Sequence, residues 1–338
     1  MVDLSISSAR EHFLRLGNHV TRRIRAFSRP RPDLPFGFVI ETSQTTLQNR
    51  RLLHPDPDFN RRVIGHLSRA LELYPVRLHA VVVMSSHLHV LATHADPEVM
   101  AGFHCHWSTN LSKEVGRTYG WRGTVFPDRY HSIELSEEPE IERARLKYIL
   151  AHGVKEGLVA SPLDWPGVSS AGALLRGEPL RGEWVDRAGY WKAKNRGEAV
   201  SLEDFTHERE VHLEPLPSLA HLSPEAYRSV IEDLLEEIEA EGRQMHRMNG
   251  TGPAGLAAIL AGDPEFRPGE VERRPCPWFH VLDPELRRAL YGALTLVMVE
   301  YRAAAEKLKA GDRSARFPLH TFAPTLGFVR DVEILEPG

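Results

Sequence analysis

One apolar run that carries two histidines limits the fold of this chain more than any other feature. Residues 81–92 read Val-Val-Val-Met-Ser-Ser-His-Leu-His-Val-Leu-Ala. Valine-rich runs of this kind are typical of buried β-strands, and the Ser85-Ser86 step predicts a tight reversal between two antiparallel neighbours. Because alternate side chains of a strand share one face, His87 and His89 are expected to point the same way, with Leu88 directed into the core.

These two histidines are candidate metal ligands. Imidazoles two residues apart on a strand lie ~6–7 Å apart, so both can bind one divalent ion. A second pair, Tyr148 and His152, stands in the stretch Tyr-Ile-Leu-Ala-His. On a helix these positions are neighbours, ~5–6 Å apart. If that helix packs beside the strand, His152 completes a metal site and Tyr148 stands next to it as a nucleophile.

The hydrophobic pattern predicts an α+β fold. We expect strands over residues 36–42, 76–84, 87–93 and 123–135, and helices over 56–73, 97–117 and 137–156. That order fits an antiparallel sheet with helices packed on one face, related to the ferredoxin-like plan. A mainly α-helical C-terminal region follows, with an acidic helix over 224–241 and another helix over 284–310.

We expect three parts along the chain. A basic N-terminal helix or arm would cover residues 1–33, the domain with the histidines 34–195, and the mainly helical region of unknown role 196–338. The acidic helix over 224–241 would repel DNA, so it should lie away from any DNA-binding groove or contact protein.

Composition restricts partners and compartment. The chain has 338 residues and a net charge of −4, so any nucleic-acid surface must be a local basic patch. Two cysteines cannot form a disulfide framework, which favours a reducing compartment. No apolar run approaches the ~20 residues needed to span a bilayer. We therefore expect a cytoplasmic protein without a membrane partner.

Several motifs occur in the order seen in one family. The run Met84-Ser85-Ser86-His87-Leu88-His89-Val90 is followed by Phe126 to His131, by Tyr148-Ile149-Leu150-Ala151-His152-Gly153-Val154, by Gly157-Leu158-Val159, by Pro162 and Trp165-Pro166, and by Ser169-Ser170. Over residues 34–175 the chain resembles the HUH single-tyrosine transposases, especially the REP-associated tyrosine transposases. The match departs from the family pattern at Ser86, where asparagine is usual, and at His152-Gly153, where asparagine and proline are usual.

The resemblance implies an HUH endonuclease core and a metal-dependent nuclease acting on single-stranded DNA near hairpins. By this resemblance Tyr148 is the nucleophile that holds the 5′-phosphate, His87 and His89 are metal ligands, and His152 replaces an amide ligand. The cofactor would be Mn²⁺ or Mg²⁺. Three imidazoles suit Mn²⁺ better than Mg²⁺, which prefers oxygen ligands.

Two other interpretations stay open. The departures at Ser86 and Gly153 are compatible with a catalytically silent, domesticated transposase that regulates by binding DNA or RNA hairpins. A metal-dependent hydrolase that uses water, with Tyr148 merely nearby, is the other alternative. The oligomeric state is open between a monomer and a homodimer, and DNA binding would associate the protein with the nucleoid.

Candidate DNA contacts are basic residues in two regions. One set lies in the N-terminal arm and the other between residues 113 and 129: Arg22, Arg23, Arg25, Lys113, Arg117, Arg122 and Arg129. Tyr130 is a rival nucleophile, although a strand tyrosine between Arg129 and His131 more readily belongs to the sheet or to a DNA contact.

Overall fold

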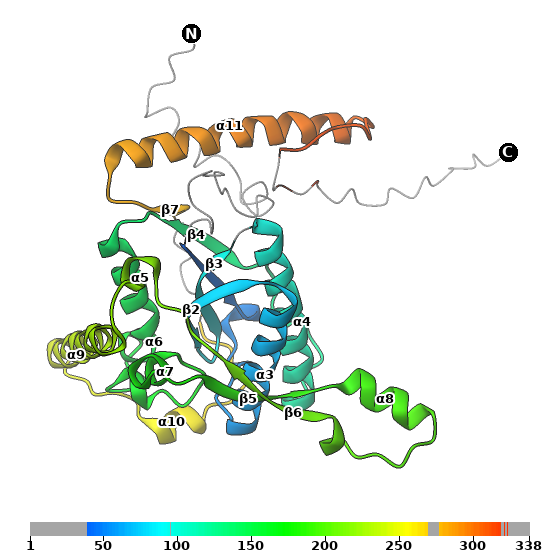
Figure 1. The fold of residues 1–338 in the computed structure, drawn as a ribbon, viewed down its shortest axis with the longest axis vertical. Coiled ribbons are helices and arrows are strands. Elements are labelled where there is room, and N and C mark those ends of the chain that lie inside the picture. The colour runs from blue at the N-terminus through cyan, green and yellow to red at the C-terminus, as the bar shows by residue number, and fades with distance from the viewer. Residues whose placement is uncertain (1–38, 95, 270–276, 319–320, 322, 324–338) are drawn as a thin grey trace, which may run out of the picture. The chain divides into compact units, whose positions relative to one another are not determined.

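The computed structural model describes residues 39–94, 96–269, 277–318, 321 and 323 (Figure 1). Its described residues fall into two compact units, one up to Pro284 and the other from Glu285 onward. The expected N-terminal helix, with Arg22, Arg23 and Arg25, lies outside the described residues. Among the helices described, none is both long and apolar enough to cross a bilayer.

The larger unit is built on a five-stranded sheet in the order β2-β3-β1-β4-β7. These strands are β1 (Val39–Thr45), β2 (Val76–Val83), β3 (His87–His94), β4 (His131–Leu135) and β7 (Phe279–His280). The first four pair antiparallel, and β7 joins β4 in parallel. The chain order strand, helix, strand, strand, helix, strand, helix agrees with the α+β fold that the sequence predicts.

The hairpin of β2 and β3 forms at the two serines. The Met84 N–H donates to the His87 carbonyl at 2.8 Å, which closes the turn. Leu88, Val90 and Ala92 pack into one core cluster, whereas Leu91 packs into a second cluster on the other face of the sheet. His87 and His89 alternate with Leu88 and Val90, so they share the face of Leu91.

Helices cover both faces of the sheet, whereas the sequence analysis expected them on one face only. α3 (Pro57–Leu73) and α4 (Pro97–Tyr119) form the first layer, each capped at its start by an aspartate, Asp56 or Asp96. α5 (Pro139–Leu150), α6 (His152–Lys155) and α9 (Pro224–Asn249) pack on the opposite face (Figure 1). The reason is that β2 and β3 are apolar on both sides, so neither face can be left in water.

Two expected elements differ most from the prediction. The strand expected over 123–135 is β4 alone, because residues 123–130 form a loop whose backbone groups bond elsewhere. In that loop the Asp128 carbonyl accepts from Gln44 Nε2 at 3.0 Å, and the Val125 carbonyl accepts from the Leu47 N–H at 2.7 Å. The helix expected over 137–156 is divided at Ala151, which ends α5 and begins α6.

Beyond residue 160 the chain adds α7 (Ala171–Arg176), β5 (Leu180–Val185), α8 (Arg187–Asn195), β6 (Thr206–Val211) and α10 (Leu256–Leu260) to the same unit. β5 and β6 pair as an antiparallel ribbon that the sequence analysis did not predict. α11 (Pro284–Lys309) matches the predicted C-terminal helix and belongs to the smaller unit. The boundaries at residues 33 and 195 stay a prediction.

The β5–β6 ribbon crosses α3 at two glycines. A Cβ atom at Gly65 would lie 1.9 Å from the Glu183 carbonyl oxygen, and one at Gly182 would lie 2.4 Å from the Arg61 carbonyl oxygen. Both neighbours are backbone atoms, so neither can move aside as a flexible side chain would. The two glycines therefore let the ribbon lie directly on the helix.

We expect Gly65→Ala to destabilise the protein by about 2 kcal/mol, because overpacking against fixed backbone outweighs the higher helix propensity of alanine. Chemical denaturation followed by circular dichroism measures the change. Gly292→Ala is the matched control, since this helical glycine has nothing within 4 Å of an added Cβ. Equal stability of Gly65→Ala and the unsubstituted protein would refute the close crossing.

Candidate metal and tyrosine site

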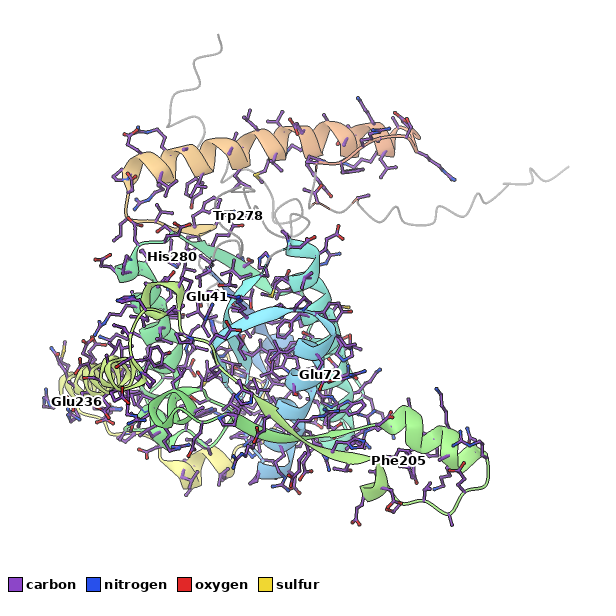
Figure 2. The ribbon with its side chains drawn as sticks, in the orientation of Figure 1. Glu41, Glu72, Phe205, Glu236, Trp278 and His280 are labelled. Carbon is purple, nitrogen blue, oxygen red and sulfur yellow. The ribbon has the colours of Figure 1, made fainter. Side chains whose placement is uncertain are left out.

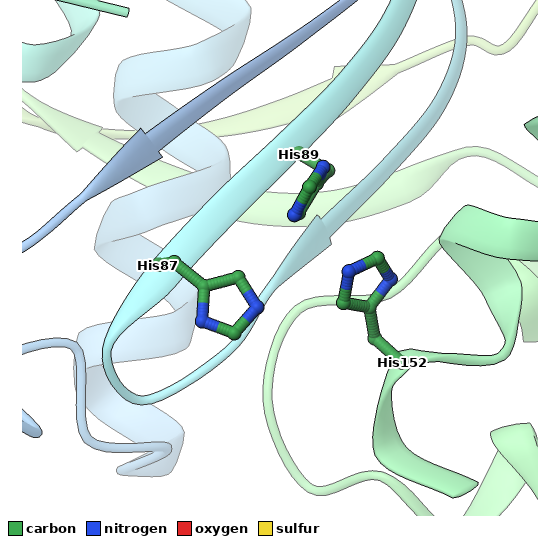
Figure 3. Close-up of side chains that lie close together, drawn as sticks. All are labelled: His87, His89 and His152. Carbon is green, nitrogen blue, oxygen red and sulfur yellow. The ribbon is translucent and has the colours of Figure 1, made fainter. Parts of the chain in front are cut away.

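Two elements bring three histidines together. β3 supplies His87 and His89 from alternate positions of one strand, and α6 begins with His152 (Figure 3). The ring centroids of His89 and His152 are 4.2 Å apart, and His87 lies 5.4 Å from each of the other two. One nitrogen from each ring lies within 4.8 Å of the others, and within the described residues no other trio of His, Cys, Asp or Glu is grouped in this way.

The three rings could hold a divalent cation. With metal–nitrogen bonds of ~2.1 Å, two donors of one ion lie at most ~4.2 Å apart, so small ring rotations bring this set to bonding distance. His89 Nδ1 lies 2.9 Å from Glu41 Oε1, and His152 Nδ1 lies 3.1 Å from the Ile149 carbonyl oxygen. Bonds of this kind fix the ring tautomer and leave the Nε2 lone pair for a metal.

Burial keeps two of these rings neutral. It lowers the pKa of His87 to about 3, with a further contribution from the neighbouring His89 and Lys155. Burial also lowers the pKa of His152, again helped by the charges of the other two histidines. A neutral imidazole is the form that binds metals, so the chemistry of the donor set fits a cation.

Tyr148 stands beside the histidines. Its ring centroid is 4.8 Å from that of His152 and 5.8 Å from that of His89. The side chain is half-buried on α5. Although Ala151 divides the expected helix, its amide still donates to the Lys147 carbonyl at 2.9 Å, so the one-turn spacing of Tyr148 and His152 survives.

Two cations contact the Tyr148 ring. The Arg145 guanidinium carbon lies 4.0 Å from the ring centroid, and Lys155 Nζ lies 3.9 Å from it. Arg145 also pairs with Glu41, the same carboxylate that bonds His89. One chain of contacts therefore runs from His89 through Glu41 and Arg145 to Tyr148.

Sequence reasoning missed four residues around this site: Glu41, Arg145, Lys155 and Glu156. For Glu41 the sequence held one signal, because it is an acidic residue inside an otherwise strand-like stretch. In the structure Glu41 is 2% exposed. Burial favours a higher pKa for Glu41, but the hydrogen bond from His89 and the charge of Arg145 lower it below the usual value. Glu156 Oε1 lies 3.4 Å from His87 Nε2, and burial raises the pKa of Glu156. No spacing rule pointed to these four residues.

The predicted DNA contacts lie in different places. Lys113 and Arg117 are exposed on α4, which packs on the sheet face opposite the histidines, and Arg117 pairs with Glu114 at 2.8 Å. Arg122 and Arg129 are exposed in the loop before β4. In the sheet, β1 pairs with β3 at Thr45 and His87 and with β4 at Ser43 and His131. β4 therefore begins at the end of the sheet where His87 lies, and Arg129, two residues before β4, is near that end.

Tyr130, the rival nucleophile, packs against a different histidine. Its ring stacks on His104 with centroids 4.0 Å apart, and His104 Nε2 lies 2.8 Å from Thr42 Oγ1. His104 is buried in the α4 layer, where burial lowers its pKa to about 3. This tyrosine is therefore outside the cluster of His87, His89 and His152.

Comparisons with solved structures find transposases. The chain is similar to a REP-associated tyrosine transposase bound to a REP hairpin, at 19% identity over 44% of this chain and 86% of the other, with a TM-score of 0.34. It is also similar to a protein of Deinococcus radiodurans R1 described as a candidate transposase, at 15% identity over 37% and 95% of the two chains, with a TM-score of 0.27. No protein-family model matches the chain, and neither does any curated protein.

We expect Mn²⁺ to raise the midpoint of thermal unfolding, because a ligand that binds only the folded state stabilises it, by about 2.7 kcal/mol at 100 times its dissociation constant. His89→Ala should abolish the shift. His131→Ala is the matched control, since this histidine is exposed and outside the triad. An unchanged midpoint for the wild-type protein in Mn²⁺ would contradict the site.

Proposed function

We propose that the chain is a metal-dependent single-stranded DNA endonuclease and strand transferase that forms a 5′-phosphotyrosine intermediate at hairpin-associated sites. The observation that carries this proposal is the half-buried Tyr148 ring, in contact with two cations and beside three clustered imidazoles. The nucleic-acid class follows from the resemblance of the motifs to the HUH transposases. We assign the catalysis to residues 34–195 and propose a cytoplasmic, nucleoid-associated location.

The proposed step exchanges one phosphate ester for another. The Tyr148 oxygen loses its proton to solvent and attacks the phosphorus atom of a phosphodiester. The bond from phosphorus to the 3′ oxygen breaks, and that oxygen takes up a proton to become a free hydroxyl. Attack by a 3′-hydroxyl on the phosphotyrosine reverses the step, so cleavage and joining are the same reaction.

Cations and imidazoles surround the Tyr148 ring. Arg145 and Lys155 place positive charge against it, where they can bind the phosphate that Tyr148 attacks. A divalent cation held by His87, His89 and His152 would supply Lewis-acid polarisation of the scissile phosphate when bound. Glu41 orients the His89 ring for that role.

Two alternatives make different predictions. A silent hairpin-binding regulator would bind DNA or RNA without cutting it, and a hydrolase that uses water would cut without a covalent adduct. The place of the Tyr148 ring beside His89 and His152 favours the nucleophile, since a spectator tyrosine would not need to lie next to the imidazole cluster. Whether the active form is a monomer or a homodimer is a separate question, which the proposal leaves open.

Tyr148→Phe should abolish the covalent adduct while leaving DNA binding intact, because only the attacking oxygen is removed. The measurement is a denaturing gel of protein incubated with labelled hairpin single-stranded DNA and Mn²⁺. Tyr130→Phe is the matched control and should form the adduct normally. Cleavage without an adduct would favour the hydrolase, and binding without cleavage would favour the regulator.

We expect faster cleavage in Mn²⁺ than in Mg²⁺, since imidazole nitrogen suits Mn²⁺ and Mg²⁺ prefers oxygen. Cleavage rates at saturating concentrations of each metal measure the preference. His152→Asn replaces one imidazole by an amide and should shift the ratio toward Mg²⁺. Higher activity of the unsubstituted protein in Mg²⁺ would refute this metal assignment.

A further inference from the structure

The β5–β6 ribbon carries a basic helix at its end. α8 and the two residues after it, 187–197, contain Arg187, Lys192, Lys194 and Arg196 and no acidic residue, in a chain whose net charge is −4. Figure 1 shows α8 at the far end of the two strands, and Figure 2 labels Phe205 at its base. The positive charge is confined to this short segment, since Asp186 precedes it and Glu198, Glu203 and Asp204 follow it, so any nucleic-acid contact here would be local.

An exposed tryptophan lies on this helix. Trp191 is 55% exposed, although an indole is among the largest apolar side chains. Its helical neighbours three and four residues away include Ala188, Lys194 and Asn195, all of which are exposed. The opposite side of the helix faces inward, because Ala193 is 1% exposed. The outer face of α8 thus presents one aromatic ring among small and basic side chains.

Two of the four cations have no acidic partner within the described residues. Arg187 pairs with the buried carboxylate of Glu114 at 3.1 Å, and Arg196 pairs with Glu198 at 2.6 Å. No ion pair occupies Lys192 or Lys194, whereas many other lysines and arginines of the described chain bond a carboxylate. These two ammonium groups remain available for anions.

Neighbouring rings hold the tryptophan in place. The Tyr190 ring lies 5.2 Å from the Trp191 ring and 5.9 Å from that of Phe205, in edge-to-face geometry. Lys194 Nζ donates to the Tyr190 hydroxyl at 3.0 Å and lies 5.6 Å from the Trp191 ring centroid. Arg187 joins the start of α8 to α4 through Glu114. The indole is therefore presented on an ordered base.

We propose that this α8 surface, formed by Trp191, Lys192 and Lys194, is a second contact for single-stranded nucleic acid. Trp191 stacks on an unpaired base, and the two lysines bind phosphates on either side of it. This inference rests on the proposed function, because it concerns the same strand that Tyr148 cuts. It goes beyond that function, because the start of α8 is bonded to α4 through Arg187 and Glu114, and the α3–α4 layer covers the sheet face opposite the histidines.

Charge and shape favour a single strand over other partners. Ammonium groups without acidic partners attract a polyanion, and an exposed indole can stack on the flat face of an unpaired base. A duplex offers phosphates but keeps its bases stacked inside, so it would use the lysines alone. An acidic protein segment would use the lysines and leave no base for the indole.

The test measures affinity without cleavage. Full-length protein carrying Tyr148→Phe binds a fluorescent thymidine 30-mer, and anisotropy gives the dissociation constant. Trp191→Ala should weaken binding about tenfold, while Trp191→Tyr should retain it, because either aromatic ring can stack. Replacing both lysines by glutamine should reduce the slope of log affinity against log salt by about 1.4. Arg196→Gln is the matched control and should change the slope less, since Glu198 already pairs with that charge.

Each outcome supports or overturns the inference. Wild-type affinity for Trp191→Ala, equal losses for alanine and tyrosine at position 191, or an equal loss on the corresponding duplex would overturn it. The adduct assay with Tyr148 intact separates the two proposals. An adduct together with no effect at Trp191 means that only the α8 contact fails. Binding that depends on Trp191 without any adduct means that only the nuclease proposal fails.

Discussion

A buried carboxylate is the group on which the site depends. Glu41 is 2% exposed, and an unpaired charge at such a position would cost several kcal/mol, so it must be compensated. His89 and Arg145 both bond it, from β3 and α5 respectively. Glu41 therefore fixes a ring of the triad and, through Arg145, a cation at the Tyr148 ring. Removing this one carboxylate would release the strand histidine and the helix arginine together.

The covered face of the sheet explains the state of the histidines. If this face were open to water, His87 would titrate near its ordinary pKa. Instead α5 and α6 cover that face, and burial lowers the pKa of His87 to about 3. The layer that supplies His152 and Tyr148 is thus the same layer that keeps the His87 imidazole neutral. Metal-binding capacity and the two-sided architecture are consequences of one packing arrangement.

Much of the fold and the triad could be predicted because the relevant signals are local. Strand alternation gives the common face of His87 and His89, and helical spacing gives the proximity of Tyr148 and His152. The prediction of a strand over 123–130 was wrong, because the backbone of this loop forms hydrogen bonds with distant groups such as Gln44. The β5–β6 ribbon was missed because β6, Thr-His-Glu-Arg-Glu-Val, is polar and alternates too weakly. Glu41 and Arg145 meet across 104 residues, a separation that no local pattern reveals.

Ion pairs with the acidic helix α9 determine which basic side chains of α5 are left to contact other groups. Arg143 and Lys147 lie one turn apart and both bond Glu237, and Lys147 also bonds Glu241. Gly242 lets α9 lie close to α6, since a Cβ there would lie 2.4 Å from Val154 Cγ1. Arg145, between the two paired cations, bonds Glu41 and contacts Tyr148 instead. α9 therefore neutralises Arg143 and Lys147 and leaves Arg145 to the site. Further cations for a DNA strand must then come from other elements. Among these, α8 carries two lysines without acidic partners in the described chain.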